Sequence, residues 1–148
     1  MRPMVYFAAA AALLALTHSA GAAEFRSVGE GGAVFFDAPS AQAKKLFVAR
    51  RYYPVALIVN LELWVKVRDA SGELAWVEKR ALSNQRTVVV TAARAHVRTA
   101  ADVASAPVFE AEKDVALEVL EIVDADWVRV GHVDGQSGYV RASEVWGL

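Results

Sequence analysis

Short stretches in which apolar and polar residues alternate run through the chain. In residues 64–68 two valines alternate with tryptophan, lysine and arginine, and residues 127–130 repeat the pattern. Because successive side chains of a β-strand point to opposite faces, each stretch predicts a strand that turns its valines towards a core. Turn-forming residues follow both stretches, at 69–72 and 133–135, and predict two β-hairpins.

The same alternation leaves little room for long helices. Only residues 41–51 are compatible with a helix, and prolines at positions 39 and 54 bracket that segment. Phe47 and Val48 fit a strand equally well, so both alternatives stay open there. The sequence as a whole predicts an all-β protein.

The predicted strands recur as an internal repeat. Trp64 matches Trp127, an offset of 63 (127 − 64). The other matches at this offset are Gly72 with Gly135, Trp76 with Tyr139, Leu82 with Val145, Val34 with Val97 and Leu46 with Phe109. Residues 55–58 instead match 117–120, an offset of 62 (117 − 55), which a compensating one-residue insertion in a loop would explain. The repeat predicts two copies of one small unit, over residues 24–86 and 87–148.

The N-terminus has the pattern of a secretory signal peptide. Arg2 precedes a charge-free apolar run over residues 4–16, and small residues follow at 19–23. The run is shorter than the ~20 residues of a membrane-spanning helix and has no polar face, which argues against a membrane anchor and an amphipathic first helix. We therefore predict a signal peptide over residues 1–23. The mature protein would begin near Glu24, have no membrane span and be periplasmic or secreted.

Residues of both repeats match a known family. The second repeat reads VR at 97–98, LEVL at 117–120, DWVRV at 126–130 and DGQSGYV at 134–140. The first reads PVALI at 54–58, WVKVRD at 64–69, AWV at 75–77, LS at 82–83 and RT at 86–87. This pattern resembles the bacterial SH3-like (SH3b) domain over nearly the whole mature chain. The resemblance implies an all-β fold of two small SH3-like β-barrels in tandem.

Departures from the family pattern limit what the resemblance implies. Ala75 stands where the family has glycine, and the family's turn after an early strand is altered at residues 35–39 and 98–101. In relatives that bind proline-rich peptides, a proline and a tyrosine build the groove. Arg141 and Glu144 occupy those places here, so recognition of proline-rich peptides is not expected.

The connection between the repeats predicts how they sit together. Residues 86–91 contain neither glycine nor proline and are rich in β-branched residues, which is typical of a strand rather than a flexible linker. A unit of ~60 residues also buries little core by itself. We therefore expect closely packed barrels, with this strand shared between them or buried near their junction, and Trp146 closing the C-terminal end.

Composition excludes several classes of function. Lys and Arg total 16 against 17 Asp and Glu, a net charge of −1 that gives no general attraction for nucleic acid. The chain has no cysteine, which excludes thiolate metal sites and lipid attachment at the cleavage site. His96 and His132 lack a spaced second ligand, and the acidic cluster at 110–114 has no partner for acid–base catalysis. We expect no enzyme activity, no cofactor and no metal site.

Comparison of the repeats predicts an apolar surface on the first. The pairs that differ at the offset of 63 are Phe35 and Phe36 against Arg98 and Thr99, and Leu61 and Leu63 against Asp124 and Asp126. Tyr52 and Tyr53 have no aromatic counterparts. Positions that are polar in one repeat face water there, so their apolar counterparts would form a patch in the other. Either the second repeat covers this patch, or it binds a ligand or partner.

Trp64 and Trp127 are the other candidate ligand-binding residues. Each alternates with core valines, which places it on the outer side of its strand, and its flat apolar face would suit a peptide or a sugar. The resemblance implies the same role, since the corresponding tryptophan of SH3-like domains commonly lines the ligand surface. The alternative is that each ring packs beneath a loop or at the junction. Trp76 and Tyr139 are expected to pack into their own barrels.

These features predict a non-catalytic binding module of the cell envelope. The candidate ligand-binding residues are Phe35, Phe36, Tyr52, Tyr53, Trp64 and Trp127. The expected ligand is a peptidoglycan peptide or another wall component. The alternative is a protein–protein interaction or assembly factor of the periplasm that uses the apolar patch of the first repeat.

Overall fold

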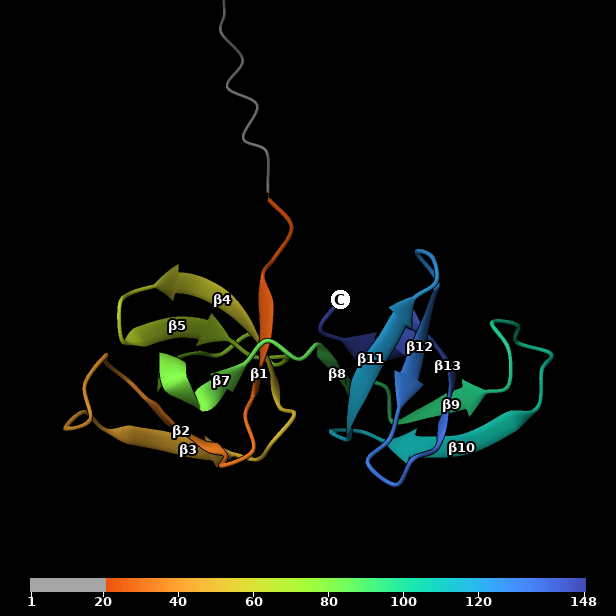
Figure 1. Ribbon diagram of the computed structural model, residues 1–148, viewed down its shortest axis with the longest axis horizontal. Coiled ribbons are helices and arrows are strands. Elements are labelled where there is room, and N and C mark those ends of the chain that lie inside the picture. Colours follow the sequence, from red (N-terminus) through yellow and green to blue (C-terminus); the bar gives the residue numbers. More distant parts are fainter. Residues whose placement is uncertain (1–20) are drawn as a thin grey trace, which may run out of the picture.

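The computed structural model describes residues 21–148, so residues 1–20 of the expected signal peptide lie outside the described part of the chain. The described residues form two seven-stranded antiparallel sheets, each curled into a small barrel. We call β1–β7 repeat one and β8–β14 repeat two. The barrels lie side by side along the long axis of the molecule, and β1, β8 and the C-terminus meet between them (Figure 1).

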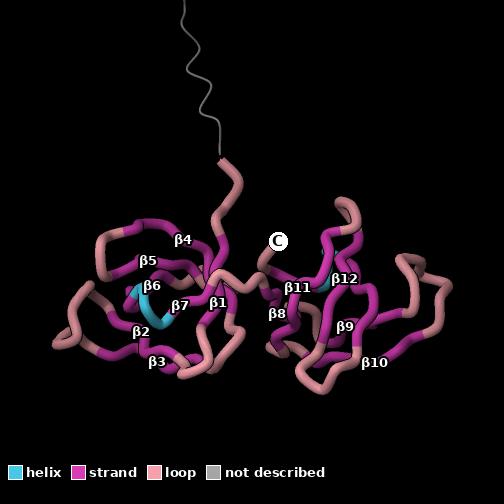
Figure 2. The backbone as a smooth tube through the Cα atoms, viewed as in Figure 1, coloured by secondary structure: helices cyan, strands magenta, loops and turns pink. Residues whose placement is uncertain are grey.

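The strands are short and joined mostly by turns and loops (Figure 2). Repeat one contains β1 (Phe25–Val28), β2 (Ala33–Phe36), β3 (Lys45–Ala49), β4 (Pro54–Asn60), β5 (Trp64–Arg68), β6 (Leu74–Glu78), the 3₁₀ turn η1 (Lys79–Ala81) and β7 (Leu82–Ser83). Repeat two contains β8 (Thr87–Val90), β9 (Arg94–Arg98), β10 (Pro107–Glu112), β11 (Ala116–Ile122), β12 (Trp127–Gly131), β13 (Ser137–Arg141), η2 (Ala142–Glu144) and β14 (Val145–Trp146). The all-β prediction is confirmed, and the segment left open between helix and strand contains β3.

Both sheets have the same strand order. It is β3-β2-β6-β5-β4-β1-β7 in repeat one and β10-β9-β13-β12-β11-β8-β14 in repeat two. In repeat one Val65 pairs with Val77 and Val67 with Ala75, so the valine faces predicted from the alternation meet across neighbouring strands. Each barrel closes around its own core. The most deeply buried valines are Val28, Val55, Val65, Val67 and Val77 in repeat one, and Val88, Val90, Val97, Val128, Val130 and Val140 in repeat two.

Strand pairing corrects the register of the repeat over its first half. Ala33 pairs with Ala49 as Ala95 pairs with Ala111, an offset of 62 (95 − 33). From β5 onwards the offset is 63 (127 − 64), because the hairpin between β11 and β12 has one residue more than the hairpin between β4 and β5. The expected matches of Val34 with Val97 and of Leu46 with Phe109 are therefore wrong, as is the compensating insertion. A slip of one residue matters in a strand because it moves a side chain to the other face.

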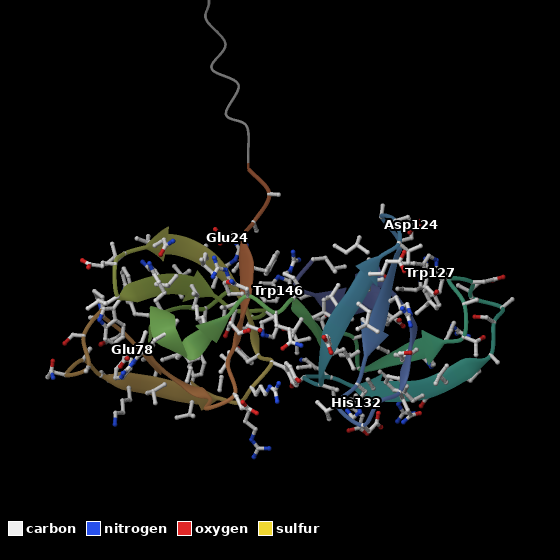
Figure 3. All side chains as sticks on the ribbon, viewed as in Figure 1. Glu24, Glu78, Asp124, Trp127, His132 and Trp146 are labelled. Atoms are coloured by element: carbon white, nitrogen blue, oxygen red, sulfur yellow. The ribbon has the colours of Figure 1, made fainter. Side chains whose placement is uncertain are left out.

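Specific contacts hold the two barrels together. The Thr87 hydroxyl donates a hydrogen bond of 2.7 Å to the carbonyl of Tyr52. The ring of Trp146 packs edge-on against Phe25 with centroids 5.1 Å apart, and Figure 3 shows Trp146 between the barrels. Within residues 21–148, β8 pairs only with β11 and β14, and all four of its residues are buried. The expected close packing is confirmed, with the connecting strand buried near the junction and not shared between the sheets.

Candidate functional site

A hollow beside Trp64 is the most promising site in repeat one. Trp64 begins β5 and stands on the face opposite the buried Val65 and Val67, as the alternation predicts. Its ring packs edge-on against Phe36, with centroids 5.4 Å apart, and stays partly exposed. The hollow beside it has a volume of about 540 Å³ and is lined by Glu62, Leu63, Trp64, Glu78, Lys79 and Arg80. We call it the Trp64 hollow.

Backbone hydrogen bonds fix the walls of the Trp64 hollow. The N–H of Leu61 donates to the carbonyl of Trp64 over 2.9 Å, which closes the turn between β4 and β5. The N–H of Lys79 donates to the carbonyl of Leu63 over 2.9 Å, which ties that turn to η1. The Leu63 side chain is 70% exposed. Together the turn and η1 hold an exposed leucine and a partly exposed tryptophan next to each other.

The polar rim of the Trp64 hollow carries both signs of charge. Glu78 forms an ion pair with Arg80, and Glu62 and Lys79 complete the rim. Such a rim around an apolar floor can orient a ligand that carries both amino and carboxylate groups, while the indole supplies the contact area.

A second depression adjoins the Trp64 hollow and shares Glu78 and Arg80 with it. Its volume is about 640 Å³. It lies between η1 and the hairpin formed by β2 and β3, and we call it the hairpin groove. Its lining consists of Gly29, Glu30, Gly31, Gly32, Ala33, Val34, Phe36, Ala41, Lys45, Val48, Glu78, Arg80 and Ala81.

The counterpart of the Trp64 hollow in repeat two is covered. Trp127 is only 9% exposed, and the guanidinium of Arg141 lies over its ring at 5.8 Å from the centroid. Arg141 is the counterpart of Glu78 (141 − 78 = 63). Asp126 replaces Leu63, and Asp124 accepts hydrogen bonds of 2.8 Å from the N–H groups of Asp126 and Trp127. Figure 3 shows Trp127 and Asp124 together at the end of repeat two. The expected open face of Trp127 is therefore wrong, and its alternative, a packed ring, holds.

Phe35 and Phe36 do not form the expected surface patch. Phe35 is 0% exposed and stacks on Phe47 with centroids 4.6 Å apart in the core of repeat one. In the corrected register its counterpart is Val97 (97 − 35 = 62), which is a core residue too. Phe36 is also buried, and its ring supports Trp64 from below.

Tyr52 and Tyr53 serve the junction and the core and do not belong to the patch. Tyr52 has a positive φ of 74°, and its carbonyl accepts the bond from Thr87. The Tyr53 hydroxyl donates to Asp69 over 3.1 Å, and burial, reinforced by the nearby Asp69 carboxylate, raises the pKa of Tyr53 above its usual range. Leu61 and Leu63 are the patch members that stay exposed, so the second repeat does not cover them.

Sequence comparison missed four lining residues of the Trp64 hollow: Glu62, Glu78, Lys79 and Arg80. The signal was present in the reversal of charge between Glu78 and Arg141, which the offset of 63 already aligned. Trp76 and Tyr139 were expected in the barrel interiors. Both are only partly buried, because each alternates with buried residues of its strand.

The described residues also bear on metal binding and on membrane crossing. Residues 21–148 contain no group of three or more His, Cys, Asp or Glu side chains that could hold a metal ion. Over this same part of the chain, no helix has the length and the apolar character needed to cross a membrane.

Both barrels match a known protein family. A family model described as "Bacterial SH3 domain" matches the chain twice, over residues 29–84 and 91–147. No curated protein matches the sequence.

The solved structures that the chain matches include two proteins of Trichomonas vaginalis. NlpC2 is 12% identical, with a TM-score of 0.36 over 84% of this chain and 48% of that chain. NlpC1 is 14% identical, with a TM-score of 0.36 over 93% and 50%. An NlpC/P60 family protein of Bacillus cereus ATCC 10987 is 16% identical, with a TM-score of 0.38 over 82% and 55%. The present chain thus spans about half the length of these solved chains.

Proposed function

The chain belongs to the bacterial SH3 domain family, and from this premise we propose that it is a non-catalytic binding module of the cell envelope. In this proposal the mature protein acts in the periplasm or outside the cell, and its repeat one binds a peptide of peptidoglycan in the Trp64 hollow.

One observation carries the proposal: the two repeats differ at the same place. Trp64 is partly exposed above a mixed-charge rim, whereas Arg141 covers Trp127 and Asp126 stands in place of the exposed Leu63. An exposed tryptophan beside an exposed leucine is costly to leave in water and suits a ligand surface. The stem peptides of peptidoglycan carry amino and carboxylate groups along a short chain, which matches the rim of Glu62, Glu78, Lys79 and Arg80.

Co-sedimentation with purified peptidoglycan sacculi tests the proposal. Leu63→Asp introduces into the hollow of repeat one the residue that repeat two has at this position, Asp126. Because Leu63 is exposed, the variant should fold like the wild type. We expect this variant to bind sacculi about tenfold more weakly than the wild type, because the ligand would desolvate a carboxylate where it met a leucine.

Leu74→Asp is the matched control. Leu74 is also exposed, lies in β6 and does not line the hollow, so this variant should bind like the wild type. A wild-type protein that stays in the supernatant, or equal losses in both variants, would refute the proposal.

A protein-interaction role is the second candidate, and a specific observation favours it. Ile58, Val59, Leu61 and Leu63 are all exposed at the end of the β4–β5 hairpin, and an apolar cluster of this kind commonly marks a protein contact. If this role is correct, affinity capture from envelope extracts returns one stoichiometric protein partner, and Leu61→Asp removes it without changing sacculus binding.

A further inference from the structure

We propose that the hairpin groove of repeat one binds the carboxyl-terminal end of a peptide whose last residues are small, with its carboxylate on Lys45. The inference rests on the proposed function, because the groove shares Glu78 and Arg80 with the Trp64 hollow. The inference goes further than the proposed function, because it states that the bound peptide ends in a free carboxylate.

Glycines that the fold requires leave one wall of the groove as bare backbone. The N–H of Gly29 donates to the carbonyl of Ala81 over 2.8 Å, and a Cβ atom at Gly29 would lie only 3.2 Å from that oxygen. Gly32 has a φ of +73°, a conformation that favours glycine. Glycine backbone therefore forms one wall, Val34 and Val48 supply apolar surface, and a ligand chain can approach closely.

The charges along the groove favour a carboxylate. Glu78 is paired with Arg80, and Glu30 is 3.4 Å from Arg51. Within residues 21–148, Lys45 is the lining cation that forms no ion pair with a carboxylate. Its ammonium can therefore donate to an incoming carboxylate without breaking an existing pair.

Repeat two provides an internal comparison, because charged side chains span the same region there. The counterparts of Val34, Val48 and Ala81 are His96, Glu110 and Glu144. His96 lies 3.3 Å from Glu110 and 3.6 Å from Glu144.

Two further replacements remove the features that favour a peptide carboxylate in repeat one. Arg94 replaces Gly32 and lies 3.2 Å from Glu110, and Pro107 replaces Lys45. Repeat two thus lacks the glycine wall and the apolar floor, and a proline stands in place of Lys45, so we assign this subsite to repeat one alone.

Titration of the mature protein with N-acetyl-alanyl-alanine and with its C-terminal amide, followed by NMR, tests the inference. We expect the free acid to bind about fivefold more tightly than the amide, the size of an exposed ion pair. Lys45→Gln should abolish this preference. Lys44→Gln is the matched control, because Lys44 is the adjacent exposed lysine and does not line the groove. Val34→His introduces the histidine that repeat two has at this position, and it should weaken the binding of both probes.

Equal affinity for acid and amide, or an acid preference that survives Lys45→Gln, overturns the inference, as does the absence of binding by either probe. The probes contain no cell-wall material, so the two proposals fail separately. A Lys45-dependent acid preference without sacculus binding keeps the groove and rejects the envelope ligand. Sacculus binding without an acid preference keeps the envelope ligand and rejects the groove.

Discussion

Single residues determine which barrel exposes its tryptophan to a ligand and how tightly each barrel is packed. At Glu78 and Arg141 the repeats carry opposite charges, and only the arginine can stack on the neighbouring tryptophan. At Ala75 and Gly138 they differ in size. A Cβ atom at Gly138 would lie 2.5 Å from the carbonyl oxygen of Arg98 and 2.8 Å from Cγ1 of Val97. Repeat two is therefore packed more tightly at this point, where β13 passes β9.

Gly138→Ala should therefore destabilise the protein even though repeat one has alanine at the same place. Overpacking of this kind costs roughly 1–3 kcal/mol, and urea unfolding measures it as a fall in the free energy of unfolding. Ala75→Gly is the comparison at the matched position, where the expected loss is about 0.5–1 kcal/mol from backbone entropy and about 0.8 kcal/mol from the buried methyl group, with no overpacking. A Gly138→Ala variant as stable as the wild type would contradict the tight packing of Gly138.

At the scale of elements, the strands were predictable because their faces differ in polarity. The alternation in β5 and β12 and the turns after them placed both hairpins from the sequence. The alignment of the two repeats was harder to predict, because their first halves share few identical residues. In addition, a shift of one residue leaves the apolar content of a short strand almost unchanged. Strand pairing was needed to show that the offset is 62 before β5 and 63 from β5 onwards.

The same slip explains which site predictions failed. Phe35 looked exposed because it was compared with Arg98 and not with the core residue Val97. Trp64 was correctly placed on an outer face by its alternation with valines. Its difference from Trp127 could not be predicted from that alternation, because a neighbouring strand supplies the side chain of Arg141 that covers Trp127.

At the scale of the whole molecule, contacts at the junction join the two small barrels into one folding unit. Arg86 donates a hydrogen bond of 2.9 Å to the carbonyl of Gly147, and its guanidinium lies 5.4 Å from the ring centroid of Phe25. Together with the Thr87–Tyr52 and Trp146–Phe25 contacts, these interactions tie both ends of repeat two to repeat one. Each barrel alone has a core of the size that is marginal for independent folding.

We therefore expect residues 24–148 to unfold in a single transition, with equal calorimetric and van't Hoff enthalpies. Trp146→Ala removes the ring that packs on Phe25 and should separate the transition into two. Differential scanning calorimetry checks both statements. Two resolved transitions in the wild type would show that the barrels fold independently and that the junction is weak.

The central claim is that repeat one, and not repeat two, presents its tryptophan to a ligand. The indole N–H resonances of Trp64, Trp76, Trp127 and Trp146 can be followed by NMR while soluble peptidoglycan peptides are added to a protein of residues 24–148. The account predicts a large shift for Trp64 and none for Trp127 or Trp146, because Arg141 covers the one and the junction holds the other. A shift of Trp127 with an unchanged Trp64 would contradict it.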